Sequence, residues 1–224
     1  MDVIGLLGMP GAGKTTALES LTGRVDKDFK ALKMKDVATE QYWGVDEHGL
    51  DYFPDEMQSK ITTEGLESEV LPNGDIGSEI GDWVDTVLSI KNDYFAKNAA
   101  DKIQRMKDAD VIVVDGIRSV PDVTCIDDVA SRFKLIFLHT PFSTRLDRLQ
   151  DRGRDGEEDV DANYLINRDE QELSWGVNKI LSSYNVTKKG YVKDYPVEFF
   201  YSDHDSIGEF GAEFSFFISD LMDV

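Results

Sequence analysis

A glycine-rich stretch near the start of the chain constrains its fold more than any other feature. An apolar run over 3–7 leads into the segment GMPGAGKTT (8–16), and a helical pattern follows. Backbone N–H groups converge on an anion only where glycines remove the Cβ atoms that block the turn or the approach of phosphate oxygens. The helix after the loop directs the positive end of its dipole at the same anion. The segment is therefore predicted to be a phosphate-binding loop between a buried strand and a helix, with a chance glycine-rich turn as the alternative.

The residues of this loop have distinct predicted roles. Lys14 is expected to reach the β and γ phosphates of a nucleoside triphosphate, and the hydroxyl of Thr15 is expected to help hold Mg²⁺. ATP and Mg²⁺ are therefore the expected cofactors. The predicted nucleotide-binding residues are Gly8, Gly11, Ala12, Gly13, Lys14, Thr15 and Thr16.

Apolar runs alternate with helical patterns along the chain. Five strands are predicted, over 3–7, within 29–37, and over 110–116, 134–140 and 197–202. The third and fourth are nearly continuous apolar runs, typical of parallel strands buried on both faces. Helices are predicted over 14–21, 78–109 with a break near Asn92, 121–132, 141–152, 162–184 and 206–222. This alternation predicts a three-layer P-loop α/β sandwich with a five-stranded parallel sheet, whose ligands bind beyond the C-terminal ends of the strands.

The length of 224 residues suits one domain with an inserted lobe. The expected parts of this single domain are a core (1–38 and 106–224), an inserted acceptor lobe (about 39–105) and a lid (about 152–168). The stretch 44–77 is acidic and repeatedly interrupted by glycine and proline. It is therefore expected to be rich in loops, with helix only within about 55–70.

The charge of the chain limits its partners. With 44 acidic and 24 basic residues, the net charge is −20. A field of this sign disfavours non-specific binding to nucleic acids or anionic membranes, and it repels a nucleotide unless basic groups are concentrated at one site. The acidic residues are spread along the chain, as in halophilic proteins that work in very high salt; an ordinary acidic cytosolic protein is the alternative. A small-molecule partner is expected, with neither nucleic acid nor membrane.

The cysteine and histidine content is low. Cys125 is the only cysteine, so no intrachain disulfide is possible and a reducing, cytoplasmic location is expected. The apolar run at the N-terminus is too short for a signal sequence or a membrane span. His48, His139 and His204 do not have the spacing of metal ligands, so no structural metal is assigned.

Two acidic residues at the predicted strand ends are candidates for the chemistry. Asp115 ends the third strand, where P-loop enzymes place a carboxylate that holds Mg²⁺ directly or through water; a capping role in the following turn is the alternative. Thr15 and Asp115 are therefore the predicted metal ligands. Asp36 is a candidate to accept the proton of an attacking hydroxyl, with a helix N-cap role as the alternative. Trp83 fits the apolar face of a helix and is expected in the core, whereas Trp43 is available for stacking.

Arginines are the other candidates, because phosphoryl transfer needs cations around the moving group. The residues concerned are Arg118, Arg145, Arg148, Arg152, Arg154 and Arg168. Arg118 is expected to grip a second phosphate with its fork of donors. Arg145, Arg148 and Arg152 share one helix face, and the acidic segment 153–163 that follows them has the character of a lid. Surface ion pairs with nearby aspartates are the alternative.

Four strings of the sequence together resemble a known group of proteins. They are GMPGAGKTT (8–16), DGIRS (115–119), RLDRLQDRGR (145–154) and RDEQELSWG (168–176). They resemble uncharacterised archaeal P-loop kinase-like proteins related to dephospho-coenzyme A kinase and to adenylate kinase-type nucleoside monophosphate kinases. The resemblance covers about 1–38 and 78–184, and it implies ATP-dependent phosphoryl transfer to a nucleotide or related small metabolite. It assigns the segment that ends the strand beside the P-loop strand to Asp115, Gly116 and Arg118, and the lid arginines to Arg148, Arg152, Arg154 and Arg168.

Two stretches depart from this resemblance, and they leave the acceptor open between a nucleotide and a coenzyme A precursor. They are 44–77 and 185–196. An alternative function is a P-loop ATPase or regulatory switch that acts on a protein partner. A GTPase is disfavoured, since the nearest approach to a guanine-recognition segment, Asn178-Lys179-Ile180-Leu181, lacks the acidic residue. A nucleic-acid-binding module is disfavoured by the net charge.

Overall fold

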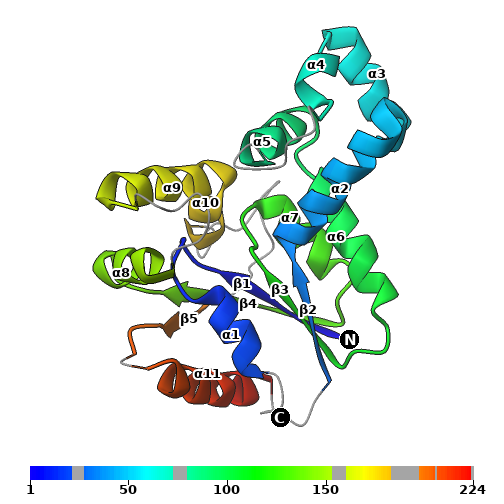
Figure 1. The fold of residues 1–224 in the computed structure, drawn as a ribbon. Coiled ribbons are helices and arrows are strands. Elements are labelled where there is room, and N and C mark those ends of the chain that lie inside the picture. Colours follow the sequence, from blue (N-terminus) through cyan, green and yellow to red (C-terminus); the bar gives the residue numbers. More distant parts are fainter. Residues whose placement is uncertain (22–27, 73–79, 153–159, 183–196, 205, 223–224) are drawn as a thin grey trace.

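A single parallel sheet forms the centre of the molecule. The computed structural model describes residues 1–21, 28–72, 80–152, 160–182, 197–204 and 206–222. The strands are β1 (Asp2–Leu7), β2 (Phe29–Lys33), β3 (Val111–Asp115), β4 (Arg132–His139) and β5 (Val197–Tyr201). They pair in the order β2-β3-β1-β4-β5, and every pairing is parallel (Figure 1). The predicted P-loop α/β fold with five parallel strands is confirmed.

Helices cover both faces of the sheet. Side chains alternate between the faces along each strand, so Ile4 and Leu6 pack on one side while Val3 and Leu7 pack on the other. The first side is covered by α1 (Lys14–Leu21) and α11 (Ile207–Met222). The second is covered by α6 (Tyr94–Arg105), α7 (Val120–Asp127) and α10 (Val177–Ser182). Burial on both faces explains why the central strands are almost wholly apolar.

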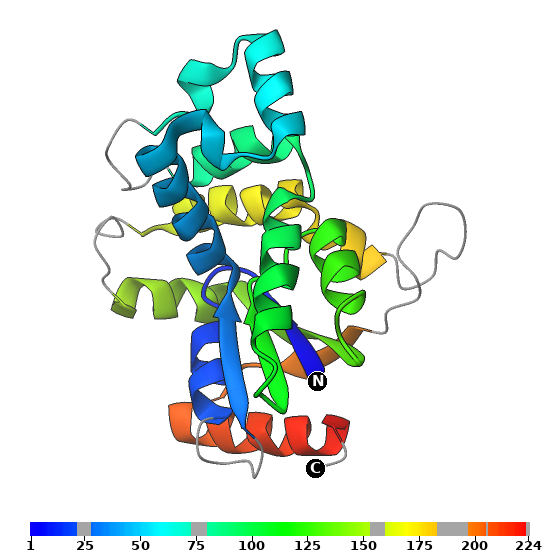
Figure 2. The same cartoon turned by 90° about the vertical axis from the view of Figure 1, so that its right-hand side faces the viewer.

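A group of helices extends beyond the C-terminal ends of β2 and β3. Its members are α2 (Met34–His48), the 3-10 helix η1 (Gly49–Tyr52), α3 (Asp55–Glu64), α4 (Glu67–Val70) and α5 (Ile80–Ile90). Figures 1 and 2 show them rising together from the sheet. Trp83 is buried in this group, as predicted, and its Nε1 donates to the carbonyl of Val70 at 2.9 Å.

The expectation of a loop-rich stretch over 44–77 is wrong for the part that the structure describes, 44–72, which is largely helical. Gly44 lies inside α2, where a Cβ atom would stand 2.1 Å from the ring of Tyr52. Gly44 therefore makes room for an aromatic ring and does not end the helix. Gly65, in contrast, does end α3, with φ +70°.

The helices of the second half agree with the predicted pattern except at two points. The helix predicted over 121–132 ends early, because α7 stops at Asp127 and β4 already begins at Arg132. The break near Asn92 is confirmed, because α5 ends at Ile90 and α6 begins at Tyr94. The helix predicted over 162–184 is divided into α9 (Ala162–Trp175) and α10. Gly176 separates them with φ +119°, and its N–H donates to the carbonyl of Leu173 at 3.1 Å. The predicted insertion 185–196 lies outside the described residues.

In the part of the chain that the structure describes, no helix combines the length and the apolar character that a membrane span requires.

The two faces of α11 provide a matched test of this packing. Phe214 is 0% exposed and stacks among Phe200 and Phe210, whereas Phe216 on the same helix is 76% exposed. Phe214→Ala is expected to lower the free energy of unfolding by about 3–5 kcal/mol because it leaves a cavity. Phe216→Ala is expected to change it by less than about 0.5 kcal/mol. Urea unfolding followed by circular dichroism measures both, and equal losses would contradict the assignment of the buried face.

Candidate functional site

The glycine-rich loop lies between β1 and α1, at the C-terminal edge of the sheet. Gly8, Gly11 and Gly13 have backbone φ values of +156°, +79° and +91°, which residues other than glycine rarely adopt. The loop is closed by a hydrogen bond of 3.1 Å from the N–H of Ala12 to the carbonyl of Met9. The predicted strand, loop and helix are therefore all present, with glycines where the backbone requires them.

Neighbouring elements hold the loop in place. The carbonyl of Ala12 accepts hydrogen bonds from the hydroxyls of Thr140, at 3.2 Å, and Ser202, at 3.1 Å. On the other side, a Cβ atom at Gly11 would stand 2.8 Å from the backbone carbonyl of Arg145, on α8 (Phe142–Arg152). Gly11 is thus needed for close packing as well as for its backbone conformation. The ends of β4 and β5 and the start of α8 together fix the shape of the loop.

Lys14 begins α1 and turns back over the loop. Its Nζ donates to the carbonyls of Gly8 and, at 3.4 Å, Met9. Burial lowers the pKa of Lys14, and the carboxylates of Glu172 and Asp115 oppose this effect. Asp115 and Glu172 are far from Lys14 in the sequence, but in the fold both carboxylates act on the Lys14 ammonium group.

The first turn of α1 contains Thr15 and Thr16, both half-buried. Their place beside the loop is the one that a phosphate and its metal ion require.

Asp115 lies beside this loop because of strand register. It pairs with Leu6 of β1 and Lys33 of β2. The N–H groups of Gly116 and Ile117 both donate to the Leu6 carbonyl at 3.2 Å. Among the described residues, Oδ1 of Asp115 is buried and has no hydrogen-bond partner. Such an oxygen is costly unless a donor or a cation compensates it, so this carboxylate suits a hard cation.

The donors present fit Mg²⁺ in particular. A carboxylate from Asp115 and a hydroxyl from Thr15 are hard oxygen ligands, and Mg²⁺ usually takes only one or two protein ligands beside phosphates and waters. Within the described ranges there is no cluster of three or more His, Cys, Asp or Glu residues that would form an all-protein metal cage.

The segment after Asp115 is rigid because a buried carboxylate organises its backbone. Oδ2 of Asp122 accepts from the N–H groups of Arg118, at 3.0 Å, and Ser119, at 2.9 Å. The Ser119 hydroxyl accepts from the Asp122 N–H in return, which completes a capping box at the start of α7. Burial raises the pKa of Asp122, and these hydrogen bonds act against that effect. The backbone of Arg118 therefore has a fixed position.

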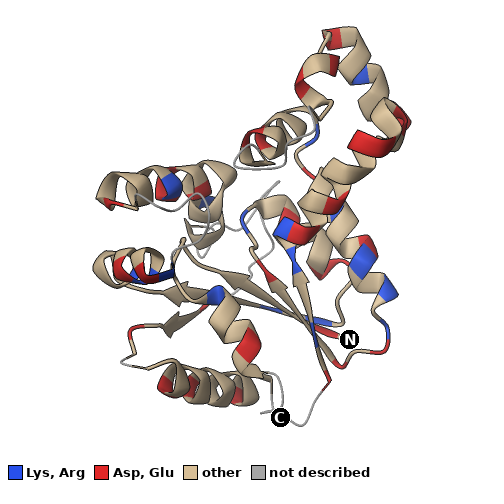
Figure 3. Ribbon diagram, viewed as in Figure 1, with Lys and Arg blue, Asp and Glu red and all other residues tan. Residues whose placement is uncertain are grey.

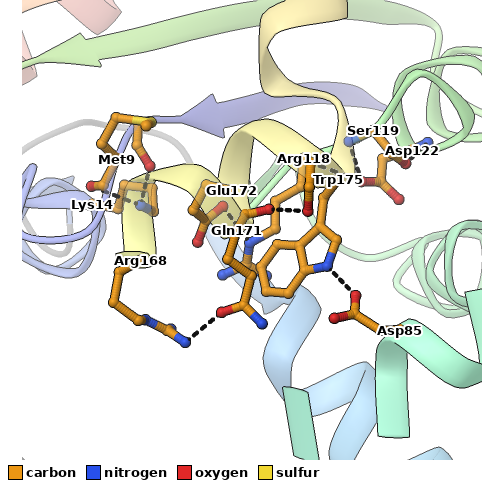
Figure 4. A network of polar contacts seen from close by, with 12 residues as sticks. Met9, Lys14, Asp85, Arg118, Ser119, Asp122, Arg168, Gln171, Glu172 and Trp175 are labelled. Atoms are coloured by element: carbon orange, nitrogen blue, oxygen red, sulfur yellow. Dashed lines mark hydrogen bonds and ion pairs between the residues drawn. The ribbon is translucent and has the colours of Figure 1, made fainter. Parts of the chain in front are cut away.

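The side chain of Arg118 links this segment to α9 (Figure 4). Its Nε donates to Oε2 of Glu172 at 2.8 Å, and its guanidinium lies over the ring of Trp175, 4.9 Å from the centroid. Burial acts to lower the pKa of Arg118, but the carboxylates of Glu172 and Asp115 outweigh it and raise the pKa. The indole Nε1 of Trp175 donates to Asp85 on α5.

The predicted cluster of arginines on α8 separates into residues with different environments. Arg145 is 6% exposed and forms two hydrogen bonds of 2.7 Å to the carboxylate of Asp169 on α9. It also donates to the carbonyl of Pro10 at 3.1 Å. Arg145 therefore connects α8, α9 and the loop, which differs from the surface ion pair that the sequence left open.

The other predicted arginines do not converge on one point. Arg148 donates to Oγ of Ser202 at 3.3 Å and to its carbonyl at 2.9 Å, beside Gly13, and burial lowers its pKa. Arg168 donates to Gln171 at 2.7 Å. Arg152 is exposed at the end of α8. Arg154 and the part of the predicted lid over 153–159 lie outside the described residues, whereas 162–168 belongs to α9.

Asp36 is exposed in the first turn of α2. The helix has Lys33 as its N-cap, so the N-cap interpretation of Asp36 is wrong. Asp36 lines a shallow groove of about 570 Å³ along α2, together with Glu40, Trp43 and Glu47. The register of Lys33 with Asp115 places the start of α2 at the same edge of the sheet as the loop.

Sequence reasoning missed Glu172 and Ser202. Glu172 lies in the string RDEQELSWG, one helical turn after Arg168, but a glutamate on a helix is usually a solvated residue. Ser202 directly follows β5, and a position after a strand end is the signal that identifies it. Glu172 contacts Arg118, and Ser202 contacts the loop at Ala12. Both contacts join residues far apart in the sequence, so they depend on the tertiary fold.

The chain matches a protein family and curated relatives over most of its length. The AAA domain family matches residues 4–171. A UPF0200 protein of Methanothrix thermoacetophila is 31% identical over 82% of this chain and 85% of the relative. A UPF0200 protein of Halobacterium salinarum is 30% identical over 80% of this chain and 78% of the relative.

The fold is also similar to that of a solved structure. A gluconokinase from Sinorhizobium meliloti 1021 superposes with a TM-score of 0.50 at 13% sequence identity, over 98% of this chain and 93% of that chain. At this level of identity the similarity describes the fold.

Two glycines separate the roles of conformation and close packing. Gly11 and Gly65 have similar φ values, +79° and +70°. A Cβ atom at Gly11 would meet the backbone of Arg145, whereas one at Gly65 would have no described atom within 4 Å. Gly65→Ala is expected to cost about 1–2 kcal/mol of stability from its left-handed backbone alone. Gly11→Ala is expected to cost about 1–3 kcal/mol more, because the carbonyl of Arg145 blocks the new methyl group. Thermal and urea unfolding measure the difference, and equal costs would show that the loop does not pack on α8.

Proposed function

The chain belongs to the AAA domain family and groups with the archaeal UPF0200 proteins, and from this premise we propose that it is an ATP-dependent kinase. Its reaction is phosphoryl transfer to a nucleotide or a related small metabolite, as in nucleoside monophosphate kinases or dephospho-coenzyme A kinase. The P-loop α/β fold and its nucleotide-binding loop support this class of reaction.

One observation carries the proposal: a buried oxygen of Asp115, beside the glycine-rich loop, has no hydrogen-bond partner in the part of the chain that the structure describes. A carboxylate in this position, next to the hydroxyl of Thr15, suits Mg²⁺ that also contacts the phosphates of ATP. When bound, the metal ion neutralises charge that develops on the phosphoryl group.

The residues of this chain then divide the work of binding and positioning. The backbone N–H groups of the loop hold the phosphates. The nucleotide-binding residues are Gly8, Gly11, Ala12, Gly13, Lys14, Thr15 and Thr16. Lys14 and Arg118 neutralise phosphate charge, and Arg148, beside Gly13, adds a cation at the other side of the loop. Arg152, Arg154 and Arg168 stay predicted contributors. Catalysis rests mainly on orientation and electrostatics.

The acceptor site is proposed to lie in the lobe over about 39–105. The groove on α2 gives this lobe an exposed aromatic surface at Trp43. Asp36 lies at the end of the groove that adjoins the sheet, and is proposed to accept the proton of the attacking hydroxyl. The segment 152–168 is proposed as the lid of this single domain.

Removal of the lysine tests the nucleotide site. Lys14→Ala is expected to lower ATP turnover by about 10²–10³-fold, because a preorganised cation at the phosphates is lost. Lys179→Ala removes an exposed lysine from α10 and is expected to leave turnover unchanged. Release of ADP, measured at low and at high salt, compares the two variants. Full activity in Lys14→Ala would reject the proposed site.

An acceptor screen tests the reaction itself. Nucleoside monophosphates and dephospho-coenzyme A are added singly, and ADP formation is compared with the rate in ATP alone. At least one acceptor is expected to raise that rate and to appear as a phosphorylated product in mass spectrometry. ATP turnover that rises only on addition of a protein would instead support a P-loop ATPase or regulatory switch.

A further inference from the structure

Glu172 is a buried carboxylate between two cations of the phosphate site. It lies on α9, is 3% exposed, and accepts the hydrogen bond of 2.8 Å from Arg118. Its charge also opposes the effect of burial on the pKa of Lys14, as does that of Asp115. Figure 4 shows the Glu172 side chain between those of Lys14 and Arg118. A negative group therefore already contacts one proposed phosphate-binding cation, Arg118, and acts electrostatically on a second, Lys14.

We propose that Glu172 is a placeholder for a phosphoryl group: its carboxylate occupies Arg118 until the nucleotide enters and displaces it. This inference rests on the proposed function. A carboxylate and a phosphate are interchangeable partners for a guanidinium, because both present oxygens to its fork of donors. The two anions repel each other at short range in a buried site, so they do not share this cation.

The pair of Arg118 and Glu172 is also poorly explained as a device for stability. Desolvation of the buried Glu172 carboxylate offsets much of its attraction to Arg118, whose side chain is 29% exposed, so this ion pair adds little to folding. Its position beside the glycine-rich loop gives it another role, which is to keep Arg118 charged and oriented before ATP binds. The fixed backbone of Arg118, held by Asp122, means that the exchange involves side chains.

The same exchange reaches the acceptor lobe. The guanidinium of Arg118 lies over Trp175, and the Trp175 indole donates to Asp85 on α5. Loss of the Glu172 contact changes the position of the guanidinium on the indole, and so alters the contact between α9 and the lobe. Nucleotide binding is thereby linked to the surface that is proposed to receive the acceptor.

An isosteric substitution tests the placeholder directly. Glu172→Gln removes the competing charge but keeps the shape, so MgATP is expected to bind about tenfold more tightly in isothermal titration calorimetry, without a rise in kcat. Glu170→Gln makes the same charge change at an exposed position of α9 and is expected to alter the Kd less than twofold. Unchanged or weaker binding in a folded Glu172→Gln protein overturns the inference.

The wild-type protein separates this inference from the proposed function. If it binds no MgATP, the proposed function fails, and the inference fails with it. If it binds MgATP but Glu172→Gln binds no more tightly, only the placeholder role is rejected.

A second measurement does not depend on the folding of Glu172→Gln. MgATP is expected to change the tryptophan fluorescence of the wild-type protein, because the guanidinium over Trp175 changes its position. Trp175→Phe is expected to lose that change while it retains an aromatic ring beneath Arg118. A fluorescence response that persists in full in Trp175→Phe, or is absent in a wild-type protein that binds MgATP, overturns the inference.

Discussion

The parallel pairing of β1 with β3 determines where every other part of the site lies. It aligns Leu6 with Asp115, and the Leu6 carbonyl accepts the N–H groups of Gly116 and Ile117. The strand that enters the glycine-rich loop and the strand that ends in the carboxylate therefore finish side by side. Because the pairing consists of backbone hydrogen bonds inside an apolar sheet, the distance between loop and carboxylate does not depend on any surface contact.

The charge around the glycine-rich loop depends more on which ionic groups are buried and paired than on the net charge of the chain. The net charge is −20, and Figure 3 shows acidic residues spread over the helices. The cations at the loop are shielded from this field in different ways: Arg145 is neutralised inside the protein by Asp169, while Arg118 is held by Glu172. Arg145 also donates to the Pro10 carbonyl of the loop, so of these two arginines Arg118 is the one proposed to bind an anionic ligand.

Local patterns predicted the sheet and the loop, because strand periodicity and glycine spacing depend only on residues that are close together in the sequence. Features that depend on a distant neighbour were not predicted. Gly44 stays helical because the ring of Tyr52 lies on it, and Gly176 ends a helix whose apolar pattern continues on both sides. Likewise, Arg145 lies on the same helix face as Arg148 and Arg152, and Glu172 resembles an ordinary solvated glutamate of a helix. Only the packing of α8 and α9 against the loop gives these two residues buried partners.

Asp169 and Glu172 are three residues apart on α9 and so lie on the same side of that helix. The carboxylate of Asp169 binds Arg145, which in turn contacts the loop at Pro10, so the part of α9 around Asp169 and Glu172 cannot shift without disturbing the loop backbone. Glu172 must therefore leave its place by rotation about its own bonds while the helix stays where it is. In the proposed exchange, the first event after ATP arrives is then a change of one rotamer, whose natural timescale is far shorter than that of a domain movement.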